Sequence, residues 1–459
     1  MHKNKMLFAA LAAVATTVGF EAQAARPAPE KRSFRSEAVD RKIEEVAAKI
    51  GNKTIRDMFI SCYPNTLDTT VKGEGYVITG DIDAMWLRDS AAQVWPYLRH
   101  LNEDAKLKNL VRSLLLRQFR AIRLDPYANA FYADERQKSG WESDQTDMKP
   151  GLHERKYEID SLCYPVRLAH GYWKATGDKS VFDAQWEETL KKILATFREQ
   201  QRKAGNKTAY HFQRKAENPT DSLGNHGYGA PVKPVGLIAS AFRPSDDATT
   251  LPFLVPSNFF AVDILRKAAE IIKATGGDAK LASECLALAD EVSAALRKYA
   301  VVETEQWGKV YAFEVDGFGG QILMDDANAP SLLSLPYLCG VDRKDPVYRN
   351  TRRMILSTEG NPYYFKGKAL EGIGSPHTGL GRVWPMSVIM RILTSESDDE
   401  IRASMKLLVS TTAGTGFMHE SVDVDNPNRF SRSWFAWANT LFGEVVLELV
   451  ERGKTDLLN

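Results

Sequence analysis

Apolar side chains recur at the spacing of an α-helix along most of the chain. From Ala261 to Ile272 they return every three or four positions, and this stretch stops at the glycine pair 276–277. Asp278 then stands where a helix N-cap is expected, because its carboxylate can accept hydrogen bonds from free backbone N–H groups. The segment 174–178 predicts a joint of the same form, in which Gly suits the left-handed C′ position. Such short joints are typical of antiparallel helical neighbours.

The pattern predicts about twelve helices over the whole chain. They are expected to begin near Ser36, Trp86, Asp104, Asp160, Lys179, Ser257, Asp278, Ala329, Pro346, Thr378, Ser397 and Ser431. Short joints alternate with long, Gly- and Pro-containing connections at 125–157, 203–256, 301–328, 359–377 and 413–430. This alternation predicts an all-α fold, an (α/α)6 toroid whose long loops gather on one face. Short strands are expected within 203–215 and 307–315.

Residues 1–24 have the pattern of a secretory signal peptide. Lys3 precedes the apolar run Met6–Phe20, and small residues follow at 22–24. A membrane anchor is the competing interpretation, but the run is shorter than the ~20 apolar residues that a span needs. We therefore expect a secreted, periplasmic protein without membrane insertion, in which 25–459 form a single catalytic domain.

Composition narrows the range of functions. The formal net charge is +1, which gives no electrostatic reason to expect a nucleic-acid partner. The sequence lacks the GxGxxG, GxxxxGK[ST], GxSxG and HExxH motifs, so no nucleotide or other cofactor is expected. No two cysteines have CxxC spacing, and each lies in apolar helical sequence, which favours buried free thiols over zinc ligands or disulfides. These cysteines are Cys62, Cys163, Cys285 and Cys339.

The densest group of polar and aromatic residues lies between positions 79 and 90. It contains Asp81, Asp83, Trp86, Arg88 and Asp89, at the opening of a predicted helix. A sugar ring needs donors and acceptors for its hydroxyl groups and an apolar plane for its C–H face. A capped helix start explains one of these carboxylates but not their number, so we predict a sugar-binding segment.

A second group lies in the longest predicted loop. Arg243 is followed by the adjacent carboxylates Asp246 and Asp247, and Asn258 stands at the start of the next helix. A glycosidase acid must keep its proton near neutral pH, which burial or a neighbouring carboxylate can achieve. An Asx turn or a calcium ligand would also account for two adjacent aspartates, so this motif alone leaves the role open.

The remaining candidates stand at other loop-to-helix junctions. Glu420 lies between a Gly/Thr-rich turn and the last predicted helix, where a carboxylate could deprotonate water. No second histidine has ligand spacing to His419, so no metal site is expected. Asp160, His377 and Trp434 complete the predicted pocket, although each has a structural explanation when taken singly. Trp434 and Trp437 are expected on one face of the last helix.

Six runs in this sequence resemble glycoside hydrolase family 125, a family of exo-acting α-1,6-mannosidases. They are GDIDAMWLRDSAAQVWPYL (80–98), YEIDSLCYP (157–165), FRPSDDA (242–248), VPSNFFAV (255–262), GSPHTGLGRVWPMS (374–387) and GFMHESV (416–422). The resemblance covers nearly all of 25–459. It implies an (α/α)6 fold, metal independence, an inverting mechanism, and terminal α-1,6-linked mannose of an oligosaccharide, N-glycan or mannan as substrate.

The resemblance also implies roles for three carboxylates. Glu420 would be the general base, and the general acid would be Asp247 or Asp246, with Asp247 preferred. Two other interpretations stay open on the residues alone. One is a different (α/α)6 enzyme, such as a trehalase-like hydrolase or a polysaccharide lyase, and the other is a glycan-binding protein without catalysis.

Overall fold

The computed structural model describes residues 26–459, so the predicted signal peptide lies outside the described residues. Helices dominate these residues, as predicted. The α-helices are α1 (Glu37–Ala47), α2 (Lys53–Cys62), α3 (Asn65–Thr69), α4 (Leu87–Val94), α5 (Ala105–Leu124), α6 (Ile159–Thr176), α7 (Ala184–Gln200), α8 (Val255–Thr275), α9 (Ala279–Tyr299), α10 (Leu335–Cys339), α11 (Pro346–Ile355), α12 (Pro385–Leu393), α13 (Asp398–Ser410) and α14 (Ala436–Glu451). Short 3-10 helices are η1 (Pro29–Lys31), η2 (Trp95–His100), η3 (Pro219–Asp221), η4 (Asn225–Gly227), η5 (Pro376–Thr378) and η6 (Thr455–Leu458).

The strands are short and lie in the long connections between helices. They are β1 (Met85–Trp86), β2 (Ala130–Phe131), β3 (Leu152–Glu154), β4 (Phe253–Leu254), β5 (Val301–Thr304), β6 (Gly308–Tyr311), β7 (Glu314–Val315), β8 (Gln321–Ile322), β9 (Tyr364–Lys366), β10 (Glu371–Ile373), β11 (Arg382–Val383), β12 (Ser421–Asp423) and β13 (Phe430–Ser431). They pair antiparallel in the orders β1-β2-β3, β4-β7-β8, β5-β6, β9-β10 and β11-β12-β13. These small sheets satisfy backbone groups in loops that must hold a fixed shape.

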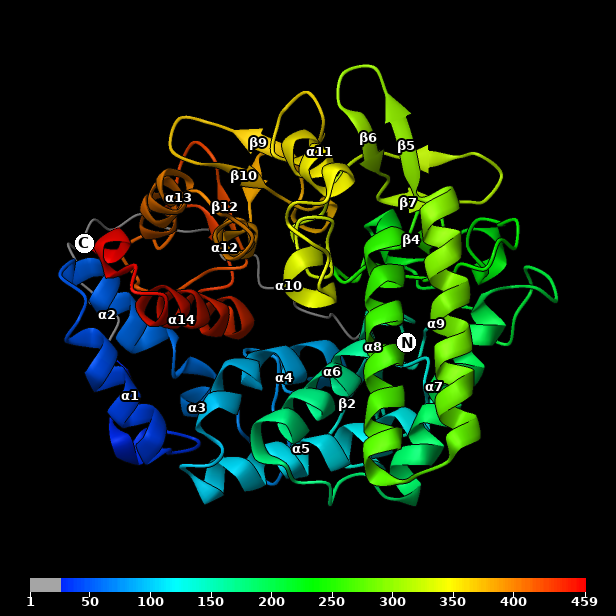
Figure 1. Ribbon diagram of the computed structural model, residues 1–459, viewed down its shortest axis with the longest axis horizontal. Helices are drawn as coiled ribbons and strands as arrows, with labels where there is room; N and C mark the ends of the chain where they lie inside the picture. The colour runs from blue at the N-terminus through cyan, green and yellow to red at the C-terminus, as the bar shows by residue number, and fades with distance from the viewer. Residues whose placement is uncertain (1–25) are drawn as a thin grey trace, which may run out of the picture.

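The helices form a ring in which the two ends of the described chain meet. Helix α4 packs on α6, α6 on α8, and α14 on both α12 and α4. Helices α5 and α7 pack on each other outside this ring, and α9 lies along α8 (Figure 1). The red α14 also contacts the blue α2. This closure brings the loops before α4, α12 and α14 to one side of the molecule.

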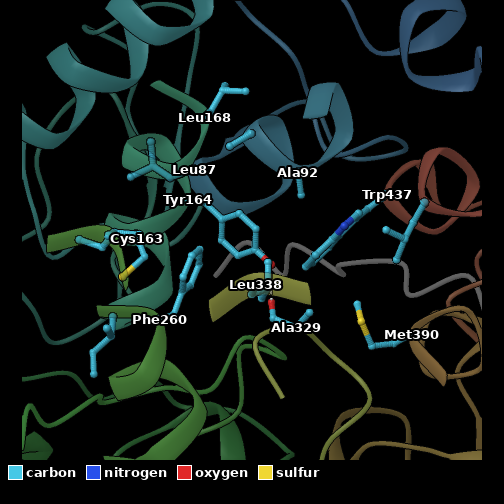
Figure 2. Close-up of a cluster of buried hydrophobic side chains, with 14 of the residues drawn as sticks. Leu87, Ala92, Cys163, Tyr164, Leu168, Phe260, Ala329, Leu338, Met390 and Trp437 are labelled. Carbon is cyan, nitrogen blue, oxygen red and sulfur yellow. Dashed lines mark hydrogen bonds between the residues drawn. The ribbon is translucent and has the colours of Figure 1, made fainter. Parts of the chain in front are cut away.

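Aromatic side chains join the inner helices at the centre of the ring. Tyr164 of α6 meets Phe260 of α8 at a ring separation of 5.0 Å and Trp437 of α14 at 5.8 Å, both edge to face (Figure 2). Its hydroxyl donates to the backbone carbonyl of Ala329 over 3.0 Å. All of these residues are buried. Edge-to-face aromatic pairs add to the energy of burial, so this cluster fixes the inner helices relative to one another.

Most predicted helix starts are confirmed within a few residues, and the capping chemistry explains several of them. Asp278 caps α9 by accepting from two backbone N–H groups, and Gly276 ends α8 with a left-handed φ of 71°. Asp178 was expected to cap the next helix, but α7 begins later and its N-cap is Asp183. The last helix begins at Ala436 rather than near Ser431. Trp434 therefore precedes it and shares no helical face with Trp437, contrary to the prediction.

Two helices and one strand differ from the sequence-based expectations. The pattern gave no separate start for α2 or α3, which follow α1 after very short breaks. The expected strands in 307–315 exist as β6 and β7, whereas 203–215 holds only one isolated bridge, between Gln213 and Gln145. All four cysteines are free, as predicted, and Cys339 alone among them is not fully buried. None of the helices in 26–459 is long and apolar enough to cross a membrane.

Candidate active site

A cavity of about 330 Å³ opens on the side where the long loops gather. Its walls come from the segments just before α4, α12 and α14 and from the loop at 244–246. The lining residues are Thr79, Asp81, Ile82, Trp86, Arg88, Asp89, Pro244, Ser245, Asp246, Asn328, His377, Trp384, Glu420, Arg432, Phe435 and Trp437. A larger hollow of about 590 Å³ lies beside α11 and α13, but it receives none of the predicted site residues.

The cavity brings together seven of the thirteen predicted site residues. They are Asp81, Trp86, Arg88, Asp89, Asp246, His377 and Glu420. The other six, which do not line it, are Asp83, Asp160, Arg243, Asp247, Asn258 and Trp434. Residues from four separate predicted groups therefore meet at one place, although not every predicted residue lines the cavity.

The six residues outside the cavity have other contacts. Asn258 is buried, and its amide bonds the backbone N–H and carbonyl of Ile238. Arg243 is also buried and donates to Glu314 over 2.7 Å. Asp83 is exposed on the outer surface, and the half-buried Trp434 lies against Gly80. Asn258 and Arg243 therefore support the loops behind the cavity, and we expect no direct sugar contact from them.

Arg88 is the centre of a buried group of carboxylates. Its guanidinium forms an ion pair with Glu158, lies 3.1 Å from Asp160 and 3.3 Å from Asp246, and approaches Asp89 at 3.6 Å. Burial raises the pKa of Asp160 to about 6, against the opposing effect of Arg88. Burial also raises the pKa of Glu158 well above its ordinary range, and the neighbouring carboxylates add to this effect. Burial therefore favours protonation of Glu158 and Asp160, whereas Arg88, Lys156 and His377 outweigh burial at Asp246 and hold its pKa below the ordinary value.

The adjacent carboxylates Asp246 and Asp247 point to different surroundings because of a tight turn. Asp246 has a φ of 66°, and its N–H bonds the carbonyl of Arg243 over 2.9 Å. Lys156 donates to the backbone carbonyl of Asp246 over 2.8 Å and so holds this strained conformation. Positive φ at a residue other than glycine is uncommon and persists only where the surroundings enforce it. The turn directs Asp246 into the cavity and leaves the side chain of Asp247 behind the wall.

The side chain of Asp247 is fully buried and bonded. It accepts from Thr220 over 2.7 Å and from Ser245 over 3.2 Å. Its Oδ1 lies 3.6 Å from Nδ1 of His377. Burial alone would lower the pKa of His377, but the adjacent carboxylate of Asp247 and the surrounding carboxylates raise it to about 9. Asp247 therefore keeps His377 protonated, and His377 presents a positive charge to the cavity.

Glu420 lies on another wall and has fewer partners. Its carboxylate accepts from Ser431 over 3.0 Å and from Arg432 over 3.4 Å. Arg432 also forms an ion pair with the exposed Asp81, which joins the loop before α4 to the loop before α14. The neighbouring His419 does not share the site, because its ring bonds backbone carbonyls and stacks on Phe430 at 3.7 Å.

Three atoms of lining residues are buried without a hydrogen-bond partner in the described part of the chain. They are Nε1 of Trp86, Nε of Arg88 and Oδ1 of Asn328. Buried polar atoms are normally bonded, so unpartnered ones at a cavity indicate a polar ligand. Together with the aromatic rings of Trp384, Phe435 and Trp437, these donors and this acceptor suit a sugar ring.

Sequence reasoning missed several residues that hold the site together. Glu158, Asn129 and Lys156 contact Arg88 or Asp246, and Arg432 contacts Glu420. Glu158 stands two positions before Asp160 in the run YEIDSLCYP (157–165). Its charge in an otherwise apolar helix start is the feature that could have identified it. Asn129 gave no such signal. Within 26–459, no group of three or more His, Cys, Asp or Glu side chains is arranged to hold a metal ion.

Carboxylates on separate walls of a sugar-sized cavity define this as a carbohydrate-active site on a helical ring. Residues 52–447 match the family described as metal-independent alpha-mannosidase (GH125). The chain belongs to this family and is therefore an α-mannosidase, a glycoside hydrolase.

Similar proteins come from a yeast and from bacteria. The "Meiotically up-regulated gene 157 protein" of Schizosaccharomyces pombe is 43% identical over an alignment of 450 residues, and the match covers 93% of this chain and 88% of that protein. A Streptococcus pneumoniae metal-independent α-mannosidase, solved in a non-productive complex with α-1,6-mannobiose, is 41% identical, with a TM-score of 0.88. The structural match covers 91% of this chain and 99% of the S. pneumoniae chain.

A more distant structure supports the fold. A bacterial glucoamylase complexed with acarbose has a TM-score of 0.53 at 13% identity, over 90% of this chain and 58% of that one. The mostly helical architecture and its match to the S. pneumoniae enzyme confirm the predicted (α/α)6 fold class.

Proposed function

We propose that this protein is an exo-acting, inverting α-mannosidase that removes terminal α-1,6-linked mannose from glycans. The observation that carries the proposal is a cavity sized for about one sugar ring with Asp246 and Glu420 on separate walls. The structural relative bound to α-1,6-mannobiose supports this linkage. A small cavity favours cleavage at the end of a chain over cleavage within it.

In the proposed mechanism, Asp246 protonates the glycosidic oxygen while Glu420 takes a proton from a water molecule. The water attacks C1 from the face opposite the leaving group as the glycosidic bond breaks, and β-mannose is released. Asp246 is preferred over Asp247 because it lines the cavity, whereas the carboxylate of Asp247 is enclosed by Thr220, Ser245 and His377. The sequence-based preference for Asp247 stays an alternative that mutagenesis decides.

Binding of the mannose would use the unpartnered polar atoms of the cavity. Trp86 and Arg88 offer N–H groups and Asn328 offers a carbonyl oxygen for hydroxyl groups of the sugar. The protonated His377 and Arg432 would bond further hydroxyl groups, and Trp437 would face the C–H side of the ring. Each of these hydroxyl groups would supply the hydrogen-bond partner that one of the buried atoms lacks.

The site of action is also a proposal. The pattern of Lys3, the apolar Met6–Phe20 and the small residues at 22–24 supports export, followed by removal of the segment and action in a periplasm. Peptide sequencing of the N-terminus of protein purified from the periplasmic fraction tests this. A mature chain that still begins at Met1 in the cytoplasm would contradict it.

The central experiment follows the anomers of the product by NMR. The protein is incubated with α-1,6-mannobiose in the presence of EDTA, with α-1,2- and α-1,3-mannobiose as matched substrates. We expect β-mannose to appear first, from the α-1,6-linked substrate and without loss of rate in EDTA. Initial α-mannose would contradict inversion, an unsaturated product absorbing in the ultraviolet would indicate a lyase, and binding without turnover would indicate a glycan-binding protein.

A further inference from the structure

A short segment between β8 and α10 joins the loop of the proposed acid to the loop of His377. The side-chain amide of Asn328 in this segment donates to the backbone carbonyl of Pro244 over 2.9 Å. The backbone N–H of Ala327 donates to the carbonyl of Gly374 over 3.1 Å, in the loop that leads to His377. Both loops line the cavity, so this segment fixes two of its walls relative to each other.

Asp326 lies in the middle of this segment and is buried behind the cavity wall. Its Oδ2 lies 3.2 Å from Oγ of Ser245 and 3.1 Å from Oγ of Ser375. Its Oδ1 accepts from the backbone N–H of Asn328 over 3.2 Å. Ser375 in turn accepts from the backbone N–H of His377 over 3.3 Å. One buried carboxyl group thus contacts both loops and a residue whose amide oxygen is unpartnered at the cavity.

The hydroxyl group of Ser245 lies between two carboxyl groups. Its Oγ is 3.2 Å from Oδ2 of Asp326 and 3.2 Å from Oδ2 of Asp247. A hydroxyl group has one hydrogen to donate, so it can bond only one of two ionised carboxylates. Both contacts become hydrogen bonds when one carboxyl group carries a proton and donates it to Ser245, which then donates to the other.

The surroundings of Asp247 favour its ionised form. Its Oδ1 accepts from the hydroxyl group of Thr220 over 2.7 Å and lies 3.6 Å from Nδ1 of His377. Burial alone would raise the pKa of Asp247, but His377 and Thr220 outweigh burial and hold this pKa below the ordinary value. The proton between the two carboxyl groups is therefore expected on Asp326.

The groups that face Asp326 from other parts of the chain agree with this placement. Arg243 is the cation that favours ionisation of Asp326, but its guanidinium already forms an ion pair with Glu314 at 2.7 Å. Asp325 precedes it on the same segment, and Tyr363 faces it from the connection before β9, so neither adds positive charge. Burial outweighs the effect of Arg243 and raises the pKa of Asp326 to about 6.

We propose that Asp326 is a positioning residue whose protonated carboxyl group donates to Ser245 and so joins the loop of the proposed acid to the loop of His377. Ser245 then donates to Asp247, which stays ionised and keeps His377 charged. Asp326 does not line the cavity and acts through the residues that it bonds. This inference rests on the proposed function, because turnover of a mannoside is one of its two readouts.

The first test compares Asp326→Asn with Asp326→Ala on α-1,6-mannobiose at about pH 5.5, below the pKa of Asp326. Asparagine is neutral, its amide N–H groups can donate to Ser245 and Ser375, and its oxygen can still accept from Asn328. Asp326→Asn should keep kcat and KM within about threefold of wild type, whereas Asp326→Ala should lower kcat by roughly 10–100-fold, because the two loops lose their shared partner. Equal losses in both variants would show that Asp326 works as an anion, and wild-type kinetics in Asp326→Ala would show no positioning role; either result overturns the inference.

Val292→Ala is the matched control for a general loss of stability. Val292 is buried in α9 and does not line the cavity, so this variant should unfold at a lower temperature and keep the wild-type kcat. Thermal unfolding of all three variants is measured beside the kinetics. A fall in kcat of Val292→Ala as large as that of Asp326→Ala would attribute both losses to destabilisation and overturn the positioning role.

The second test detects the proton itself and does not depend on turnover. The infrared difference spectrum of wild type minus Asp326→Asn at the same pH should contain the carbonyl stretch of a protonated carboxyl group. Carboxylate bands in its place would mean that Asp326 is ionised and would overturn the inference. If the protonated band is present but the wild type does not hydrolyse mannobiose, the proposed function is wrong and the proton on Asp326 still stands.

Discussion

The two walls that hold the proposed acid and base differ in how they surround a carboxylate. Asp246 is enclosed by Arg88, Asn129 and Lys156, all buried, in a turn with positive φ. Glu420 is bonded only by Ser431 and Arg432 among its described neighbours.

The two proposed roles make different demands on these surroundings. A general acid must carry a proton when substrate is bound, whereas in the free protein Arg88, Lys156 and His377 outweigh the effect of burial and hold the pKa of Asp246 below its ordinary value. A general base must be ionised and reach water, and a carboxylate with few partners beside an open cavity meets both needs. The predictions below test whether the two walls carry these separate roles.

The largest effect is expected from removal of the base. Glu420→Gln should lower kcat on α-1,6-mannobiose by roughly 10²–10⁴-fold, since glutamine cannot accept the proton of the attacking water. Steady-state kinetics and calorimetric titration with mannose measure turnover and binding separately. Asp423→Asn, which removes a carboxylate outside the cavity from the same segment, serves as the control and should keep near wild-type turnover. Full activity of Glu420→Gln would place the base elsewhere.

The acid wall is tested by the pair Asp246→Asn and Asp247→Asn. Asp246→Asn should lower mannobiose hydrolysis by roughly 10²–10⁴-fold, because the leaving oxygen then departs unprotonated. Asp247→Asn should reduce it far less, through a weaker hold on His377. Parallel kinetics of the two variants measure this contrast. The reverse order of effects would assign the acid to Asp247 and remove the distinction drawn between the two residues.

The charged residues of the two walls should also differ in how much they stabilise the folded protein. Arg88→Met should lower the free energy of unfolding by about 3–5 kcal/mol at pH 7, because it leaves several buried carboxylates without a cation. Arg432→Met should cost only about 1 kcal/mol, since its partner Asp81 is nearly half exposed and solvent screens the pair. Urea unfolding of both variants measures the two values. Equal losses would show that both walls depend on charge pairing to the same degree.

A last prediction is a pH dependence of stability through His377. Its pKa of about 9 in the folded protein exceeds the ordinary value of 6.5. Its stabilising contribution is therefore fully present below about pH 6.5 and is lost as the pH rises through 9. Compared with His377→Gln, the wild type should gain on the order of 2 kcal/mol at pH 6 and almost nothing at pH 9.5. A difference that does not vary with pH would mean that His377 is neutral beside Asp247.

The sequence predicted the helices better than the composition of the site. Helix periodicity and caps are local, so Asp278 and Gly276 could be identified as boundaries before their surroundings were known. Helices α2 and α3 were missed because very short breaks hide their separate starts. The last helix begins at Ala436, later than expected, and Trp434 before it packs against the loop at Gly80, a contact that no local pattern encodes.

The site illustrates the same limit at the level of single residues. Chemistry-rich runs showed where carboxylates, arginine and tryptophan gather, and seven of the predicted residues do line the cavity. Sequence alone could not show that Asn258 and Arg243 support the loops from behind. It also gave no reason to choose Glu158, since the importance of that residue comes from Arg88, which is distant in the chain.

The sequence by itself therefore determined the helical class, the places where loops carry chemistry, and the resemblance to a mannosidase family. These properties depend on periodicity and on short runs of residues. Only the tertiary structure decided which carboxylate of the adjacent pair Asp246 and Asp247 faces the cavity. The two differ by one position in the chain, and the left-handed turn at Asp246, held by Lys156 and Arg88, gives them opposite surroundings.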